Sequence, residues 1–315
     1  MRNKKILSTV CLALSCAFLT ACASAPKKTN FNNYWNENFL VYEPINETLV
    51  YDVTFEKDET YGYDLSYANG KYVTTFKNSV ENGQNVYLYT TELSIDVTYI
   101  LGEAHTTLHD SVKTETIFYP AEQGLTPLSS KKWVISSSPV AATPTKLDEC
   151  YLSVNYEIIT TYDENGGECV VTTDGKTTKH DFDFGNEGFS YLDSTQTLLA
   201  LRALPMRTSS TRVLSYNPFT RSVQKTAIVA RETASAEFSF YKNGSAEKQT
   251  QTISYRPVQF QLDEKRPGFA QTAWIATTSE TVPNTHRNVM LRLEQPVYRS
   301  MGTFVYQLSS SSYVL

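Results

Sequence analysis

The sequence lacks the short motifs by which many enzymes are recognised. It contains no glycine-rich phosphate loop, no Gly-x-Ser-x-Gly elbow and no Ser-x-x-Lys motif in a catalytic context. It also contains no cluster of basic residues of the kind that binds nucleic acid. We therefore predict that the protein is not an enzyme, needs no cofactor and binds no nucleic acid. Catalytic groups that converge from separate loops leave no such motif, so this prediction covers motif-based chemistry only.

Apolar runs of membrane-spanning length are also missing. The run from Ile6 to Phe18 is shorter than the about 20 residues that a spanning helix needs, and basic residues precede it, as in an export signal. The tetrad Leu-Thr-Ala-Cys, which ends at Cys22, follows this run and resembles a bacterial lipobox. By that resemblance, residues 1–21 are a lipoprotein signal peptide, and Cys22 carries a diacylglyceryl thioether. The alternatives are an uncleaved N-terminal anchor and an ordinary secretory signal.

A lipid on Cys22 would fix the location of the protein. Each buried methylene contributes about 0.8 kcal/mol, so two or three chains hold a protein durably on a membrane. We predict a lipid-anchored protein of the bacterial cell envelope, on the periplasmic side of the inner or outer membrane or on the outer face of a Gram-positive membrane. Residues 22–38 are predicted to form a flexible tether, and residues 39–315 a single β-rich domain.

Basic residues are in the minority in the mature chain. Removal of the signal takes away three of 28 basic residues and no acidic ones, which leaves 25 against 33 and a net charge of −8. An acidic surface repels the phosphate groups of nucleic acids. The predicted partners are therefore the membrane, a lipid or acyl-chain ligand, and an envelope protein.

Two cysteines remain for the folded domain, because Cys22 is the predicted lipid site and two others leave with the signal. An exported protein can form a disulfide. A hairpin around the Asn-Gly-Gly sequence at residues 165–167 would pair Cys169 near Tyr162, far along the ladder from Cys150. We predict two free, buried thiols, with a disulfide between sheets as the alternative.

The composition and patterning predict an all-β domain. Tyr and Phe number 21 and 15, Thr and Val are frequent, and Gly and Pro are modest in number. Alternation in Glu47–Glu56 predicts a strand, as does the β-branched content of Val86–Leu101, and we count roughly a dozen and a half such segments. The pair Asn69-Gly70 predicts a hairpin turn. Residues 136–147 are either a linker or a long loop within one domain. A sheet of this size curls on itself.

One stretch, Tyr191–Arg207, predicts a helix. Asp193 and Gln196 have the spacing of a capping box, and Pro205 prevents continuation. The apolar face of this helix is wide, and the leucines that share it are spaced three apart; they are Leu198, Leu201 and Leu204. We predict that the helix lies on the concave face of a large, curved antiparallel sheet.

Three segments carry a resemblance to a known fold: residues 47–53, residues 125–128, and the helix from Leu198 to Pro205 with its polar turn at Asp193. This order resembles the LolA and LolB superfamily of envelope carriers and an uncharacterised lipoprotein family of the same half-barrel fold. The resemblance implies an apolar cavity for acyl chains and supplies no catalytic residue. The lipid site makes the chain more similar to LolB, whereas its length and the absence of a multi-helix lid depart from both families.

The functional prediction follows from this fold. We predict that the protein binds an apolar ligand, such as the acyl chains of a lipid or lipoprotein, in a cavity lined by Leu198, Leu201 and Leu204. The alternative is a structural or partner-binding envelope lipoprotein with a filled core and no small-molecule ligand.

Candidate metal ligands occur in two places. His105 and His109 lie near carboxylates, but on a strand this spacing separates them by about 13 Å, too far to share an ion. We predict a solvated loop there. The segment His180–Asp183 is similar to the start of a calcium loop, yet Gly185 stands where an oxygen ligand belongs, so we predict a turn. No metal site is therefore predicted.

Overall fold

A computed structural model describes the chain over residues 28–32, 46–57, 63–140, 143–185, 188–205, 209–263, 270–277, 288–297 and 302–314. The signal sequence and Cys22 lie outside the described residues, as does most of the predicted tether. Their assignments therefore stay predictions.

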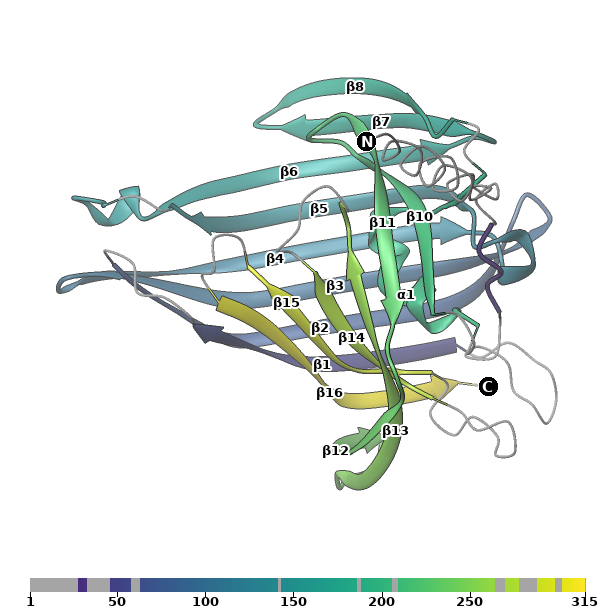
Figure 1. Ribbon diagram of the computed structural model, residues 1–315. Helices are drawn as coiled ribbons and strands as arrows, with labels where there is room; N and C mark the ends of the chain where they lie inside the picture. Colours follow the sequence, from purple (N-terminus) through teal and green to yellow (C-terminus); the bar gives the residue numbers. More distant parts are fainter. Residues whose placement is uncertain are drawn as a thin grey trace, which may run out of the picture.

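The protein is mainly β, and a single sheet of 16 strands contains all the strands of the described residues (Figure 1). Its first half is an antiparallel meander in which each strand pairs with the next. These strands are β1 (Asn46–Lys57), β2 (Asp64–Glu81), β3 (Gln84–Leu101), β4 (Ala104–Phe118), β5 (Pro127–Pro139), β6 (Tyr151–Tyr162), β7 (Gly166–Thr173) and β8 (Lys176–Asp183).

The second half of the chain continues the sheet from its other side. Its strands are β9 (Ser190–Tyr191), β10 (Ser210–Asn217), β11 (Ser222–Ala230), β12 (Ala234–Lys242), β13 (Gln249–Gln261), β14 (Gln271–Ala276), β15 (Met290–Pro296) and β16 (Gly302–Val314). The last strand, β16, pairs with β1, so the order runs from β8 back to β1 and then through β16, β15, β14, β13, β11 and β10 to β9. The sheet therefore has β8 at one end and β9 at the other.

Within the second half, five strands form a closed ring. β12 pairs with β13 on one side and with β16 on the other, whereas β13 to β16 pair in sequence. The β12 to β16 pairing is parallel, as is the β9 to β10 pairing. The predicted large curved sheet is confirmed, with the addition of this ring and of two parallel contacts.

The predicted helix is present and begins where the capping box indicates. A 3₁₀-helix, Ser194–Gln196, leads into α1 (Thr197–Arg202). The Asp193 side chain accepts a hydrogen bond from Thr195 N at 2.7 Å, and Asp193 N donates to Gln196 Oε1 at 3.0 Å. These contacts satisfy backbone and side-chain groups that the first turn would otherwise leave without partners. Two further 3₁₀-helices are Ala121–Gln123 and Leu147–Glu149.

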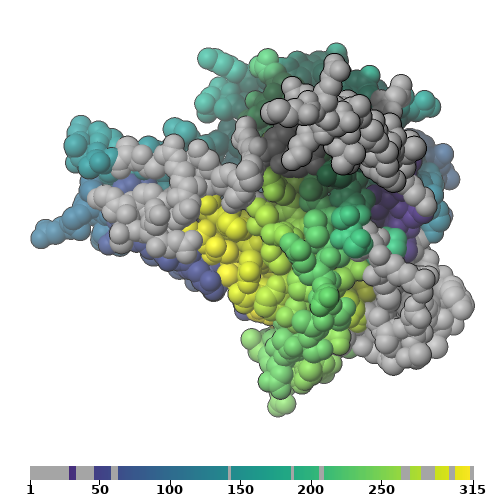
Figure 2. All heavy atoms as spheres, viewed as in Figure 1, coloured from purple at the N-terminus to yellow at the C-terminus, as the bar shows by residue number. Residues whose placement is uncertain are grey.

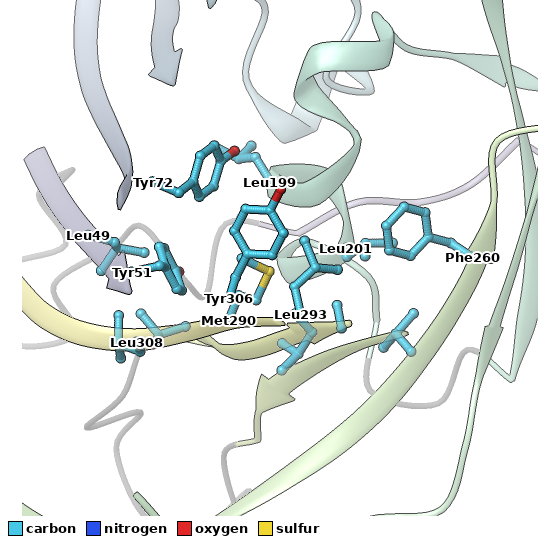
Figure 3. Close-up of a cluster of buried hydrophobic side chains, with 14 of the residues drawn as sticks. Leu49, Tyr51, Tyr72, Leu199, Leu201, Phe260, Met290, Leu293, Tyr306 and Leu308 are labelled. Carbon is cyan, nitrogen blue, oxygen red and sulfur yellow. The ribbon is translucent and has the colours of Figure 1, made fainter. Parts of the chain in front are cut away.

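The main core lies between α1 and the strands that surround it. Leu199 and Leu201 are each 1% exposed, and Tyr51, from β1, has the same low exposure. Figure 3 labels these side chains in one cluster with aromatic residues from β2 and β16, and with leucine and methionine from β15. The concave side of the sheet is therefore filled with side chains around the helix.

The predicted hairpin at Asn69-Gly70 is wrong. Strand β2 continues through it, with a shift of register against β3 between Ala68 and Lys71. Asn69 has φ 54°, and a Cβ on Gly70 would lie 2.3 Å from Val53 O, so this Asn-Gly pair forms a bulge pressed against β1. The turn between β2 and β3 falls instead at a second Asn-Gly pair, Asn82 and Gly83, which both have positive φ.

Three other segments differ from expectation. The loop predicted around His105 and His109 is part of β4, because these residues pair with β3 across a tight turn. The segment from His180 to Asp183 is strand, and the turn begins only after it. Residues 136–139 belong to β5, which pairs directly with β6, so the segment that follows is a connection within one sheet and not a linker between domains.

Both remaining cysteines are free and buried, as predicted. Cys169 pairs with Thr160 in the β6 to β7 ladder, which is near but not at the predicted partner. Burial raises the pKa of each thiol, because the thiolate loses hydration.

Part of the predicted tether lies on the domain. Thr29 N donates to Ser190 Oγ at 3.1 Å, and Asn32 N donates to Ala203 O at 2.9 Å. Phe31 is 9% exposed and belongs to the main core. The chain is therefore attached to the domain by residues 28–32, earlier than the predicted start of order near residue 39.

Candidate functional site

The two ends of the sheet meet without forming a backbone ladder between described residues. Aromatic rings join them: Phe182 of β8 stacks on Tyr216 of β10 with centroids 4.0 Å apart, and Phe184 stacks on Tyr191 of β9 at 4.5 Å. We call these four residues the aromatic seam. Tyr191 OH also reaches the turn between β6 and β7, at 3.1 Å from Glu164 O. In Figure 1, β10 and β11 accordingly cross in front of the upper strands of the meander.

A hollow of about 160 Å³ lies beside the aromatic seam, between β5, β6 and β10. We call it the β5–β10 pocket. Its walls are partly apolar, with Ile158, Phe219 and Leu262, and partly polar, with Lys132 and Tyr216. The remaining residues of its lining are Ser130, Thr160, Tyr162, Asp193, Ser194, Thr195, Ser215, Asn217, Pro218 and Gln224.

Asp193 joins the helix to the sheet at one side of the pocket. It is 4% exposed, and its Oδ2 accepts hydrogen bonds from Ser130 Oγ and Tyr162 OH, both at 2.6 Å. Its Oδ1 accepts from the N and Oγ1 of Thr195, at 2.7 and 2.6 Å. Burial, followed by the charge of Asp193, holds the pKa of Tyr162 well above its ordinary value. The carboxylate is therefore already surrounded by four donors.

Lys132 brings a positive charge to the same pocket. It lies on the inward face of β5, between buried Ser130 and buried Val134. Within the described part of the chain, its ammonium has no hydrogen-bond or ion-pair partner. Burial lowers the pKa of this ammonium, and the charge of Asp193 opposes that shift without a direct contact.

Tyr216 supplies a second polar group without a partner. It is 6% exposed, and its buried OH has no hydrogen-bond partner among the described residues. Stacking on Phe182 fixes the ring, and burial raises the pKa of the phenol. A buried donor without a partner costs about 1–3 kcal/mol, so the position of this hydroxyl needs a reason beyond packing.

The mouth of the pocket is apolar. Phe219, on the turn between β10 and β11, is 61% exposed, and its ring meets that of Tyr156 edge to face with centroids 5.0 Å apart. Figure 2 shows the green part of the chain, to which β10 and β11 belong, below the teal strands of the meander. An exposed apolar ring therefore lies beside the hollow.

The leucines predicted from the sequence lie elsewhere. Leu201 and Leu204 are 1% and 3% exposed and belong to the main core, against which partly buried Leu198 also packs. The β5–β10 pocket is at the opposite, N-terminal end of the helix. At the C-terminal end, Arg202 forms a bidentate ion pair with Glu47, one bond of which measures 2.9 Å, and both side chains are 4% exposed.

The candidate metal residues do not come together. His105 and His109 are both exposed on β4, and His109 Nδ1 lies 2.8 Å from Asp96 Oδ1. Over the described residues, no group of three or more His, Cys, Asp and Glu side chains could hold a metal ion.

Sequence reasoning missed Lys132, Tyr216 and Phe219. One signal for Lys132 was present. Side chains two residues apart on a strand lie on the same face, so Lys132 shares the inward face of β5 with Ser130 and Val134. A charged residue on the inward face of a strand is uncommon unless it has a partner. No comparable signal identifies the tyrosine, because buried tyrosines are abundant in this core.

Comparison of the chain with protein-family models, with curated proteins and with solved structures found no match. In the residues that the structure describes, no helix has the length and apolar character needed to cross a membrane. The resemblance to LolA and LolB stays a prediction.

Proposed function

We propose that this protein is a lipid-anchored protein of the bacterial cell envelope that binds an apolar ligand, such as an acyl chain, and carries out no catalysis. The observation that carries the proposal is the β5–β10 pocket: a hollow beside the aromatic seam whose walls include Ile158 and Leu262, with an exposed Phe219 at its mouth. Each methylene that leaves water contributes about 0.8 kcal/mol, so such walls favour a chain over a polar solute.

The aromatic seam supports a route for the ligand. Its contacts are ring stacking and side-chain hydrogen bonds, for example between Phe182 and Tyr216. Separation of stacked rings breaks no backbone ladder, whereas separation of two paired strands breaks a hydrogen bond at every second residue of each strand. We therefore expect the sheet to widen more readily at the aromatic seam than between the strands of its long antiparallel ladders.

The helix does not serve as a lid in this proposal. It is fastened at its first turn by the hydrogen bonds of Asp193 and at its last turn by the ion pair of Arg202 with Glu47. Its leucines fill the main core. The ligand therefore enters beside the helix and leaves the helix in place.

The test uses the full-length chain carrying Cys22→Ala, so that its own predicted lipid is absent. Native mass spectrometry of this chain is expected to detect bound lipid, and a fluorescent long-chain fatty acid is expected to bind it. Phe219→Ser should weaken binding of the probe by about tenfold, because a buried Phe contributes about 1.5–3 kcal/mol. The matched control is Leu152→Ser, since Leu152 is 63% exposed on β6 and does not line the pocket.

Two results would overturn the proposal. One is a protein that carries no lipid and does not bind the probe. The other is an equal effect of the Phe219 and Leu152 substitutions, which would mean that the probe adheres to exposed apolar surface in general.

One observation favours a second function. The concave side is filled, with Leu201 and Leu204 almost fully buried, as expected for a structural or partner-binding protein. Among the described residues, strand β8 pairs with a neighbouring strand on one edge only, and a partner can add a strand to such an edge. Crosslinking in intact cells separates the two functions: one reproducible protein partner, together with the absence of bound lipid, would favour the second.

A further inference from the structure

We propose that the β5–β10 pocket recognises a carboxylate at the end of the apolar ligand, held by the ammonium of Lys132 and the hydroxyl of Tyr216. This inference rests on the proposed function and names the chemical class of ligand, an acid with an apolar chain. It starts from two hydrogen-bond donors that line one hollow, the buried hydroxyl of Tyr216 and the partly buried ammonium of Lys132, neither of which has an acceptor among the described residues.

Neither donor makes a hydrogen bond to an acceptor of the pocket lining. Asp193 is the only carboxylate in the lining of the pocket, but its oxygens already accept from Ser130, Tyr162 and twice from Thr195. It makes no ion pair with Lys132, on which it acts only through space. The pocket therefore has an unused cation and an unused hydroxyl, and a carboxylate has two oxygens that accept hydrogen bonds.

The backbone of Lys132 and the ring of Tyr216 are held in place before any ligand arrives. Lys132 extends from a strand that is paired on both sides, by β4 and by β6. Tyr216 is held by its stack on Phe182, with an interplanar angle of 8°. The Tyr216 hydroxyl, on a ring that is already held, loses little freedom on binding and orients the ligand, whereas the flexible side chain of Lys132 supplies the charge.

The size of the pocket indicates that it takes one end of a ligand. At about 160 Å³ it is smaller than the roughly 300–1,000 Å³ of pockets that enclose a whole small molecule. Apolar Ile158 and Leu262 line the same hollow, and Phe219 continues the apolar surface outward. A ligand whose carboxylate binds Lys132 and whose chain leaves the pocket past Phe219 would contact both the polar and the apolar residues of the lining.

The experiment compares octanoate with octan-1-ol, which has the same chain length but no charge. Binding of each to the full-length chain carrying Cys22→Ala is measured by isothermal titration calorimetry. We expect octanoate to bind at least about tenfold more tightly than octan-1-ol, because hydrogen bonds to charged groups exceed neutral ones. Lys132→Met should remove that preference, and Tyr216→Phe should reduce it by about threefold to tenfold.

The matched control is Lys131→Met. Lys131 is the neighbouring residue on β5, but it is exposed on the outer face, so its substitution removes the same charge without altering the pocket. The octanoate preference should survive in this variant. An equal loss in the Lys131 and Lys132 variants would overturn the inference, because the preference would then reflect net charge alone.

The remaining outcomes separate this inference from the proposed function. If octanoate and octan-1-ol bind equally and Phe219→Ser weakens both, the apolar site stands and the carboxylate subsite is refuted. If neither ligand binds, the carboxylate subsite is refuted; if the long-chain fatty-acid probe does not bind and no lipid is carried either, the proposed function fails with it. Circular dichroism verifies the fold of each variant, and the Tyr216→Phe variant keeps the test decisive if Lys132→Met does not fold.

Discussion

The buried ion pair between Arg202 and Glu47 provides the sharpest test of the fold. Arg202 ends α1, and Glu47 lies near the start of β1, so the pair joins the helix to the strand at the centre of the sheet. Arg202 Nε also donates to Asn288 O at 3.1 Å, and Asn288 Nδ2 returns a bond to Arg202 O at 3.0 Å. Three segments distant in sequence therefore depend on one guanidinium.

The magnitude follows from the burial of the pair. Both side chains are 4% exposed, so removal of one partner leaves a charge in the interior without its counterion. Such a change costs about 3–5 kcal/mol, whereas replacement of both partners by apolar residues of similar size is often close to neutral. We expect Arg202→Met to lower the free energy of unfolding by about 3–5 kcal/mol and the double variant with Glu47→Leu to recover most of that loss.

The assay is urea unfolding followed by circular dichroism. With an m value of about 3 kcal/mol/M, the single variant should shift the midpoint by about 1 M or more. The exposed pair of Lys113 with Glu92, whose side chains are 54% and 52% exposed, serves as the control. Lys113→Met should cost less than about 1 kcal/mol, because water screens that pair.

A loss below about 1 kcal/mol for Arg202→Met would place the pair at the surface and refute its burial. Equally, additive losses in the double variant would show that the two side chains are not coupled.

Three further predictions concern other parts of the fold. Gly70→Ala should lower stability by about 1–3 kcal/mol, because the new Cβ would meet Val53 O, and an unchanged urea midpoint would contradict the bulge. Burial raises the pKa of Tyr72 to about 12. In the unfolded chain the Tyr72 phenol ionises near pH 10, so its contribution to the free energy of unfolding is complete below about pH 10 and is lost as the pH rises toward 12. Tyr72→Phe should therefore reduce the fall of the urea midpoint over this pH range. The two buried thiols should react with a thiol reagent only as the protein unfolds; rapid labelling of the native protein would oppose this.

Much of the fold could be predicted from local patterns. The two-residue alternation of β1 predicts its buried face because neighbouring side chains of a strand point to opposite sides, and Leu49, Tyr51 and Val53 are buried as the pattern indicates. The spacing of Asp193 and Gln196 predicts the first turn of the helix, since both contacts of a capping box lie within four residues.

Local pattern failed where a distant strand decided the outcome. Two Asn-Gly pairs occur in β2 and after it, and both permit positive φ. Only the second, at Asn82 and Gly83, forms the turn, because β1 lies against Gly70 and the longer pairing with β3 holds the strand straight through the first. Contacts with the neighbouring strands therefore determine which of the two Asn-Gly pairs forms the turn.

The sequence by itself determined the all-β class, the helix with its cap and the free state of the two thiols, because each depends on contacts between near neighbours or on spacing along one ladder. Only the tertiary structure decided that the ends of the sheet meet at the aromatic seam and that Lys132 and Tyr216 line one pocket. These residues come from strands near opposite ends of the sheet, and no local periodicity records how far a sheet curls.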